Sequence, residues 1–166
     1  MFFSFLKSKP TLKELIPNGF VDIHSHILPG IDDGAVNLKE SLDLVKEMKK
    51  LGFGKLIGTP HTYPGLYENT SESIKNSFEV LKTSCKTKIK LSYASEYFID
   101  YSMVNKNEID KYLTLDDKHI LLETGFIFKP NCLFDVIFGL IISDYCSTPE
   151  HYQSISSLGD WLKQEK

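Results

Sequence analysis

The chain has 166 residues, a formal net charge of −3, 42% hydrophobic residues and 25% charged residues. This size and composition are typical of one globular domain that buries a core, and the 19 basic residues form no block of the kind that binds nucleic acid. All 19 are lysines, so the chain lacks arginine, the residue that clamps phosphate groups with two parallel hydrogen bonds.

The cysteines and the apolar segments indicate the compartment. Cys85, Cys132 and Cys146 lie far apart without a Cys-x-x-Cys motif, which argues against disulfides and a structural zinc site and suits a reducing cytosol. The apolar run Met1–Leu6 is shorter than a signal-peptide core, and Cys132–Ile142 is too short to span a bilayer. We therefore expect a cytoplasmic protein without membrane insertion.

The first half of the chain predicts two strand–helix pairs. Phe20–His26 is rich in β-forming residues and predicts a strand, and the apolar stripe of Leu38–Leu51 predicts a helix with a capping box at its start. Lys55–Thr59 predicts a short buried strand that ends at a proline. A second helix is expected at Thr70–Cys85, with Asn69 and Glu72 at capping distance.

The second half continues the alternation of strands and helices. The patterns predict strands at Lys88–Tyr97 and His119–Thr124, a short helix near Met103–Tyr112 and a helix at Cys132–Ile142, while Ser157–Lys163 also has helical character. Such an α/β order implies a parallel sheet or part of a (β/α) barrel. A complete (β/α)₈ barrel takes roughly 200–250 residues, so four strands predict a partial barrel.

Two histidines at the end of the first predicted strand suggest metal chemistry. His24 and His26 are separated by one residue, so strand periodicity places both imidazoles on the same side, where they can chelate one ion. The alternative is a pair of histidines satisfied by hydrogen bonds in a turn. For the motif alone, the two interpretations have about equal weight.

Four further candidate ligands shift the balance toward a metal site. Each follows or ends a predicted strand or lies in the loop after one: Asp33 in Asp32-Asp33-Gly34, His61, Glu96 and Glu123. In a barrel, the carboxyl ends of successive strands meet at one mouth, and a glutamate at the end of an apolar strand is costly unless it meets a cation. We therefore expect these side chains to converge on divalent metal ions.

Four motifs in this order resemble those of the bacterial capsule-type protein-tyrosine phosphatases, members of the polymerase and histidinol phosphatase (PHP) superfamily. The first and most specific is VDIHSHILPGIDDGA at residues 21–35. The others are Thr59-Pro60-His61, Ser95-Glu96-Tyr97 and Leu121-Leu122-Glu123. The resemblance extends roughly from Leu15 to Ile142 and defines one PHP-like domain over residues 1–166, with a lead-in at 1–18, a well-matched part at 19–143 and a divergent tail at 144–166.

The resemblance implies a distorted (β/α)₇ barrel with two or three divalent ions, usually manganese. It implies removal of phosphate from tyrosines of a membrane-associated tyrosine autokinase that controls capsule or exopolysaccharide synthesis, by attack of a metal-bound hydroxide. By motif match, His24 and His26 share an ion with Glu96. Glu96 and Glu123 serve a second ion, and Asp33 and His61 a third. The oligomeric state stays open.

The chain departs from the family pattern near its end. The family's His-Pro-Glu-Arg-Tyr motif reads Thr148-Pro149-Glu150-His151-Tyr152 here, and the sequence stops at Lys166, before the family's late Asp-x-His pair. We therefore expect a partial PHP-type barrel that lacks its last strands. A truncated, non-catalytic remnant that binds metal or a partner without turnover is the alternative function. Hydrolysis of a small phosphomonoester such as histidinol phosphate is a third.

Overall fold

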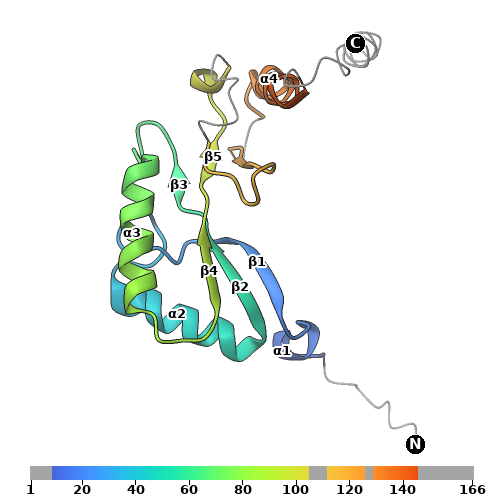
Figure 1. The fold of residues 1–166 in the computed structure, drawn as a ribbon. Helices are drawn as coiled ribbons and strands as arrows, with labels where there is room; N and C mark the ends of the chain where they lie inside the picture. Colours follow the sequence, from blue (N-terminus) through green and yellow to red (C-terminus); the bar gives the residue numbers. More distant parts are fainter. Residues whose placement is uncertain (1–8, 105–111, 126–128, 146–166) are drawn as a thin grey trace, which may run out of the picture. The chain divides into compact units, whose positions relative to one another are not determined.

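The computed structural model describes residues 9–104, 112–125 and 129–145, and its ribbon is drawn in Figure 1. The chain divides into two compact units, Met1–Ser95 and Glu96–Lys166. The first unit holds a parallel sheet with helices packed on it, and the second holds a shorter strand pair with a core of its own. The mixed α/β class expected from the sequence is confirmed.

The sheet of the first unit has the strand order β1-β2-β4 and is parallel throughout. Its strands are β1 (Phe20–Ser25), β2 (Phe53–Gly58) and β4 (Lys90–Tyr93). Gly58 pairs with Ser25 on one side and with Tyr93 on the other, so the three carboxyl ends lie in one row. The register between β1 and β2 shifts after Asp22, which marks an irregularity just before the predicted histidine motif.

Two long helices contact the sheet and each other. Helix α2 (Leu38–Leu51) contacts β2, and α3 (Ser71–Ser84) contacts β4, as Figure 1 shows. Asn37 caps α2 by accepting a hydrogen bond from Glu40 N–H at 3.1 Å, and Gly52 ends it in the left-handed conformation with φ 114°. Fully buried side chains fill the interior of this unit: Leu28, Val45, Leu56, Ile74 and Leu81.

Short elements complete the first unit. Helix α1 (Leu12–Leu15) precedes β1, and β3 (His61–Thr62) follows Pro60 after the end of β2. The sequence patterns had predicted neither. Both are too short to show a periodicity of their own, since α1 spans a single helical turn and β3 has two residues.

In the described residues, the second unit contains a parallel strand pair, a short helical turn and one helix. Strand β5 (Glu96–Phe98) pairs with β6 (Leu121–Glu123), η1 is a 3₁₀ turn at Tyr101–Met103, and α4 spans Leu133–Tyr145. A buried cluster joins these elements: Ile99, Met103, Tyr112, Cys132 and Val136. Among the residues that the structure describes, no helix is both long and apolar enough to cross a bilayer.

Two of the element predictions need correction. The single strand expected at Lys88–Tyr97 is wrong, because the ladder stops at Tyr93 and a separate strand begins at Glu96. Ser95 Oγ donates to Pro60 O at 3.1 Å, which holds the chain out of the ladder at this point. Where a helix near Met103–Tyr112 was expected, the structure has the 3₁₀ turn, and residues 105–111 lie outside the described part. The helix expected at Ser157–Lys163 also lies outside it.

Candidate metal centre

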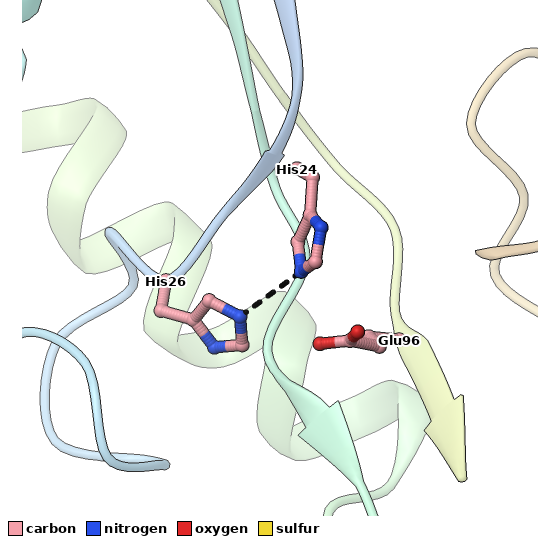
Figure 2. A group of neighbouring side chains, drawn as sticks. All are labelled: His24, His26 and Glu96. Carbon is pink, nitrogen blue, oxygen red and sulfur yellow. Dashed lines mark hydrogen bonds between the residues drawn. The ribbon is translucent and has the colours of Figure 1, made fainter. Parts of the chain in front are cut away.

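His24 and His26 lie at the carboxyl end of β1 with their imidazoles turned toward one another (Figure 2). The two Nε2 atoms are 3.3 Å apart, within hydrogen-bonding distance. Ser25, between them, is fixed to the neighbouring strand, because its N–H donates to Thr59 Oγ1 at 3.0 Å and its hydroxyl donates to Ile57 O at 2.9 Å. The predicted convergence of the two histidines on one side of the strand is confirmed.

The loop after β1 brings Asp32 under His26. The Asp32 side chain is fully buried, and its Oδ2 lies 2.7 Å from His26 Nδ1. It also accepts hydrogen bonds from Gly34 N–H at 3.0 Å and from His61 N–H at 3.2 Å. One carboxylate therefore joins the end of β1, the loop and the start of β3.

Gly34 allows the loop to approach the backbone of His26. A Cβ at position 34 would lie 2.2 Å from His26 O and 2.3 Å from His26 Cβ, distances that real Cβ atoms do not show. The next residue, Ala35, donates its N–H to His26 O at 3.0 Å and is fully buried. A side chain at position 34 would thus push the loop, and Asp32 with it, away from the histidine.

Asp33 and His61 form a second pair of possible ligands. Asp33 Oδ1 lies 3.6 Å from His61 Nε2 and 3.8 Å from His26 Nδ1, and its side chain is 62% exposed. His26, Asp33 and His61 each offer a ligand atom within 4.8 Å of the others. The structure thus brings three of the predicted ligands together, from a strand end, a loop and the next strand.

Neighbouring side chains fix the position of His61. The ring of Tyr67 stacks on the imidazole with centroids 5.4 Å apart and an angle of 10° between the planes. Asn69 Nδ2 donates to His61 O and to Ile31 O, both at 2.8 Å, and so ties β3 to the loop that carries Asp32 and Asp33. Asn69 was expected at the start of α3, but the N-cap is Thr70, which accepts from Ser73 N–H at 3.1 Å.

Burial, hydrogen bonds and nearby charges shift the pKa values of three side chains near the histidines. Burial opposes ionisation of Asp32, but the hydrogen bonds from His26, Gly34 and His61 outweigh it and lower its pKa. Ionised Asp32 therefore stabilises the fold above the ordinary aspartate pKa, and this contribution is lost as the pH falls through the lowered value. Burial raises the pKa of Asp22, and burial with the carboxylates of Asp33 and Asp32 raises that of Tyr67.

The two predicted glutamates belong to the strand pair of the second unit. Glu96 is the first residue of β5 and is drawn in Figure 2, and Glu123 is the last residue of β6. Glu96 pairs with Leu121, two residues before Glu123, so the glutamate side chains stand on the same face of this pair. Glu96 was expected to end a strand, and it begins one. Glu123 ends its strand as predicted.

The donor set fits divalent transition metals. Imidazole nitrogen and carboxylate oxygen bind such ions at about 2.0–2.2 Å, so two donors to one ion lie no more than about 4.4 Å apart. The His24–His26 separation of 3.3 Å and the Asp33–His61 separation of 3.6 Å both lie inside this limit. Each pair can therefore serve one ion without moving the backbone.

The remaining histidines lie elsewhere or outside the described residues. His119 is exposed, and its Nδ1 lies 2.7 Å from Asp116 Oδ1. Thr148 and His151 fall outside the described part of the chain.

The sequence analysis did not identify the separate role of Asp32. The sequence signal there is two adjacent acids before a glycine, and this pattern does not tell which of the two acids is buried.

The fold and the side chains define a class, the parallel α/β proteins with a candidate divalent-metal centre at their strand ends. The chain belongs to the family described as capsular polysaccharide synthesis, CpsB/CapC, whose model matches residues 20–145. It is 30% identical over 107 residues to the tyrosine-protein phosphatase CpsB of Streptococcus agalactiae, covering 62% of this chain and 44% of the relative. It is 29% identical over 135 residues to the tyrosine-protein phosphatase YwqE of Bacillus subtilis, covering 79% and 53%.

The fold also resembles a solved structure. It matches a chain from the crystal structures of YwqE from Bacillus subtilis and CpsB from Streptococcus pneumoniae, described as unique metal-dependent tyrosine phosphatases. The TM-score is 0.68 at 26% identity, covering 75% of this chain and 52% of the solved one. The chain thus spans about half the length of the relatives that it matches.

Proposed function

We propose that this protein is a metal-dependent phosphatase that removes phosphate from protein tyrosine. The observation that carries the proposal is the convergence of two donor pairs of the first unit, His24 with His26 at 3.3 Å and Asp33 with His61 at 3.6 Å. Ligand atoms of His26 and Asp33 also lie within 4.8 Å of each other. Its family and the named activity of its relatives support the same reaction. The substrate that we propose is a membrane-associated tyrosine autokinase of capsule or exopolysaccharide synthesis, dephosphorylated in the cytoplasm.

The metal assignment follows the pairs of donors. We propose that His24 and His26 hold one ion with Glu96, that Glu96 and Glu123 serve a second, and that Asp33 and His61 hold a third, with manganese as the preferred metal. The residue types support this assignment, because imidazole nitrogen and carboxylate oxygen are donors that divalent transition metals bind.

The chemistry divides between the ions and the side chains of this chain. When bound, divalent ions would acidify a water molecule and neutralise the phosphoryl oxygens. Asp32 would hold the His26 ring in place, while Tyr67 covers one face of the His61 ring. Asp33, which is more exposed than Asp32, would supply the second ligand of the ion at His61. These 166 residues include no arginine that could clamp a phosphate group.

We propose further that the two compact units together form one PHP-type domain, part of a (β/α)₇ barrel. The parallel order β1-β2-β4 and the parallel pairing of β5 with β6 support this architecture. In such a barrel the ends of successive strands share one mouth, which is where the assigned ligands would meet. An oligomer is compatible with the proposal.

Hydrolysis of a phosphotyrosine peptide by the 166-residue chain with manganese tests the proposal. We expect turnover that a chelator abolishes and that falls by about 100-fold or more in His61→Ala, because an ion would lose one of its ligands. His119→Ala is the matched control, because that histidine is exposed and paired with Asp116, and it should leave turnover unchanged. Full turnover in His61→Ala or in the chelated sample would contradict the proposal.

A second candidate function is binding without turnover. It is favoured by Thr148, which stands where the family pattern has a histidine, and by the lack of arginine. A folded chain that binds manganese and a phosphotyrosine peptide but does not hydrolyse it would support this alternative.

A further inference from the structure

Asp32 and Asp33 are adjacent in the chain but have opposite environments. The Asp32 side chain is 0% exposed, while that of Asp33 is 62% exposed. Oδ2 of Asp32 faces His26 Nδ1 and His61 N–H, and Oδ1 accepts from Gly34 N–H. Both oxygens of Asp32 are therefore engaged by the protein itself, whereas Asp33 can turn its carboxylate toward an ion.

The bond to His26 decides where that imidazole carries its proton. A neutral imidazole has one donor and one acceptor nitrogen, and an ionised carboxylate only accepts. With ionised Asp32 Oδ2 at 2.7 Å, a neutral His26 would carry its proton on Nδ1 and its lone pair on Nε2. The 3.3 Å contact between the two Nε2 atoms would then be a hydrogen bond that His24 donates.

We propose that Asp32 is a positioning residue that fixes the tautomer and the orientation of His26 before any metal binds. This inference rests on the proposed metal site and deepens it. The lone pair of His26 Nε2 is directed toward His24, and for the two rings to share an ion His24 would release its Nε2 proton or carry it on Nδ1 instead. Because Asp32 also accepts from His61 N–H, the same carboxylate holds the two histidine-bearing segments at a fixed separation. Carboxylate partners of metal-binding histidines commonly act in this way.

Nuclear magnetic resonance of the metal-free protein tests the proposal directly. Long-range ¹H–¹⁵N spectra at about pH 8, where ordinary imidazoles are neutral, report the tautomer of each histidine. We expect His26 to be protonated on Nδ1 and His24 on Nε2 in the chain as it stands. Asp32→Ala should lose this preference in both histidines. Asp33→Ala, an equal truncation one residue away, should keep it.

Manganese titration supplies the second readout. Asp32→Ala is expected to bind manganese about 10–100-fold more weakly, although the variant removes no proposed ligand. Asp33→Ala should also bind manganese more weakly. The two variants are therefore distinguished by the His26 tautomer and not by their manganese affinity. An unchanged manganese affinity in folded Asp32→Ala overturns the proposal, and so does an unchanged His26 tautomer in that variant.

The proposal remains testable if Asp32→Ala does not fold. In that case the spectrum of the unaltered chain decides, because a His26 protonated on Nε2 contradicts the proposal without any variant. The metal-free spectrum needs neither ion nor substrate, so its outcome is separate from that of the phosphatase test. A chain without phosphatase activity can still show the expected tautomer, and an active chain can still lack it.

Discussion

The two compact units hold their candidate ligands by different means. In the first unit, Asp32, Asn69 and Ser95 join strand ends and loops through side-chain hydrogen bonds between residues up to 38 positions apart. In the second, Glu96 and Glu123 are placed by the register of two three-residue strands. The hydrogen bonds of the first unit fix the position of each imidazole ring. The strand register of the second unit fixes only that the two glutamates stand on the same face. The comparison indicates that the histidines of the first unit are preorganised by its loops.

The largest expected effect comes from Gly34, where the loop touches the backbone of the histidine motif. Gly34→Ala should destabilise the protein by about 4 kcal/mol or more, because the new methyl would lie 2.2 Å from His26 O and backbone cannot yield easily. Gly65→Ala is the control. Gly65 has φ 82° with nothing within 4 Å of a new Cβ, so only about 1 kcal/mol of backbone strain is expected.

Urea unfolding of both glycine variants checks this expectation. Gly34 is not in the left-handed conformation, so its loss reports the steric contact at the His26 loop, whereas the loss in Gly65→Ala reports backbone strain without such a contact. Equal losses in Gly34→Ala and Gly65→Ala would mean that the close packing of this loop is unimportant for stability.

A core substitution tests whether the two units unfold together. Leu56→Ala should cost about 3 kcal/mol, because Leu56 is fully buried in the first unit and its truncation leaves a cavity. If both units form one domain, amide exchange should accelerate equally at Ile99 N–H, which donates to Glu123 O in the second unit. Faster exchange confined to the first unit would mean that the two units unfold separately and form two domains.

A smaller effect is expected at Asn69, the bridge between β3 and the loop before Asp32. Asn69→Ala removes the donor to Ile31 O and His61 O and should cost about 1–2 kcal/mol. Because the His61 segment is then held less firmly, manganese affinity should also fall by a small factor. Thermal melting and manganese titration of Asn69→Ala measure both effects. An unchanged affinity would show that Asp32 and the strand alone position His61.

Local signals in the sequence predicted the elements of the first unit well. The helix Leu38–Leu51 has the predicted bounds, because the Asn37 cap and the Gly52 end are encoded within the segment itself. The strands expected at Phe20–His26 and Lys55–Thr59 appear as Phe20–Ser25 and Phe53–Gly58. Nearby residues set these features, so a single sequence is enough to find them.

Contacts between distant residues could not be read from the sequence. Asn69 is of a residue type that commonly caps helices, yet its side chain donates to Ile31 O and His61 O, which lie 38 and 8 positions away. The break after Tyr93 depends on the bond from Ser95 to Pro60 O, 35 positions earlier. The residue types of the candidate ligands were predictable. Which acid is buried against His26 and which is exposed to an ion depends on the path of the loop, so the different roles of Asp32 and Asp33 were not.

The central claim is that the strand-end histidines and Asp33 bind a divalent metal. Calorimetric titration of the metal-free chain with manganese, after the chelator has been removed, tests this claim most directly. We predict saturable binding to the unaltered chain and to His119→Ala, and binding weakened at least about 10-fold in Asp33→Ala and in His61→Ala. Circular dichroism of each variant establishes that it is folded. Equal manganese affinity in all four folded proteins, or no binding to the unaltered chain, would contradict the account.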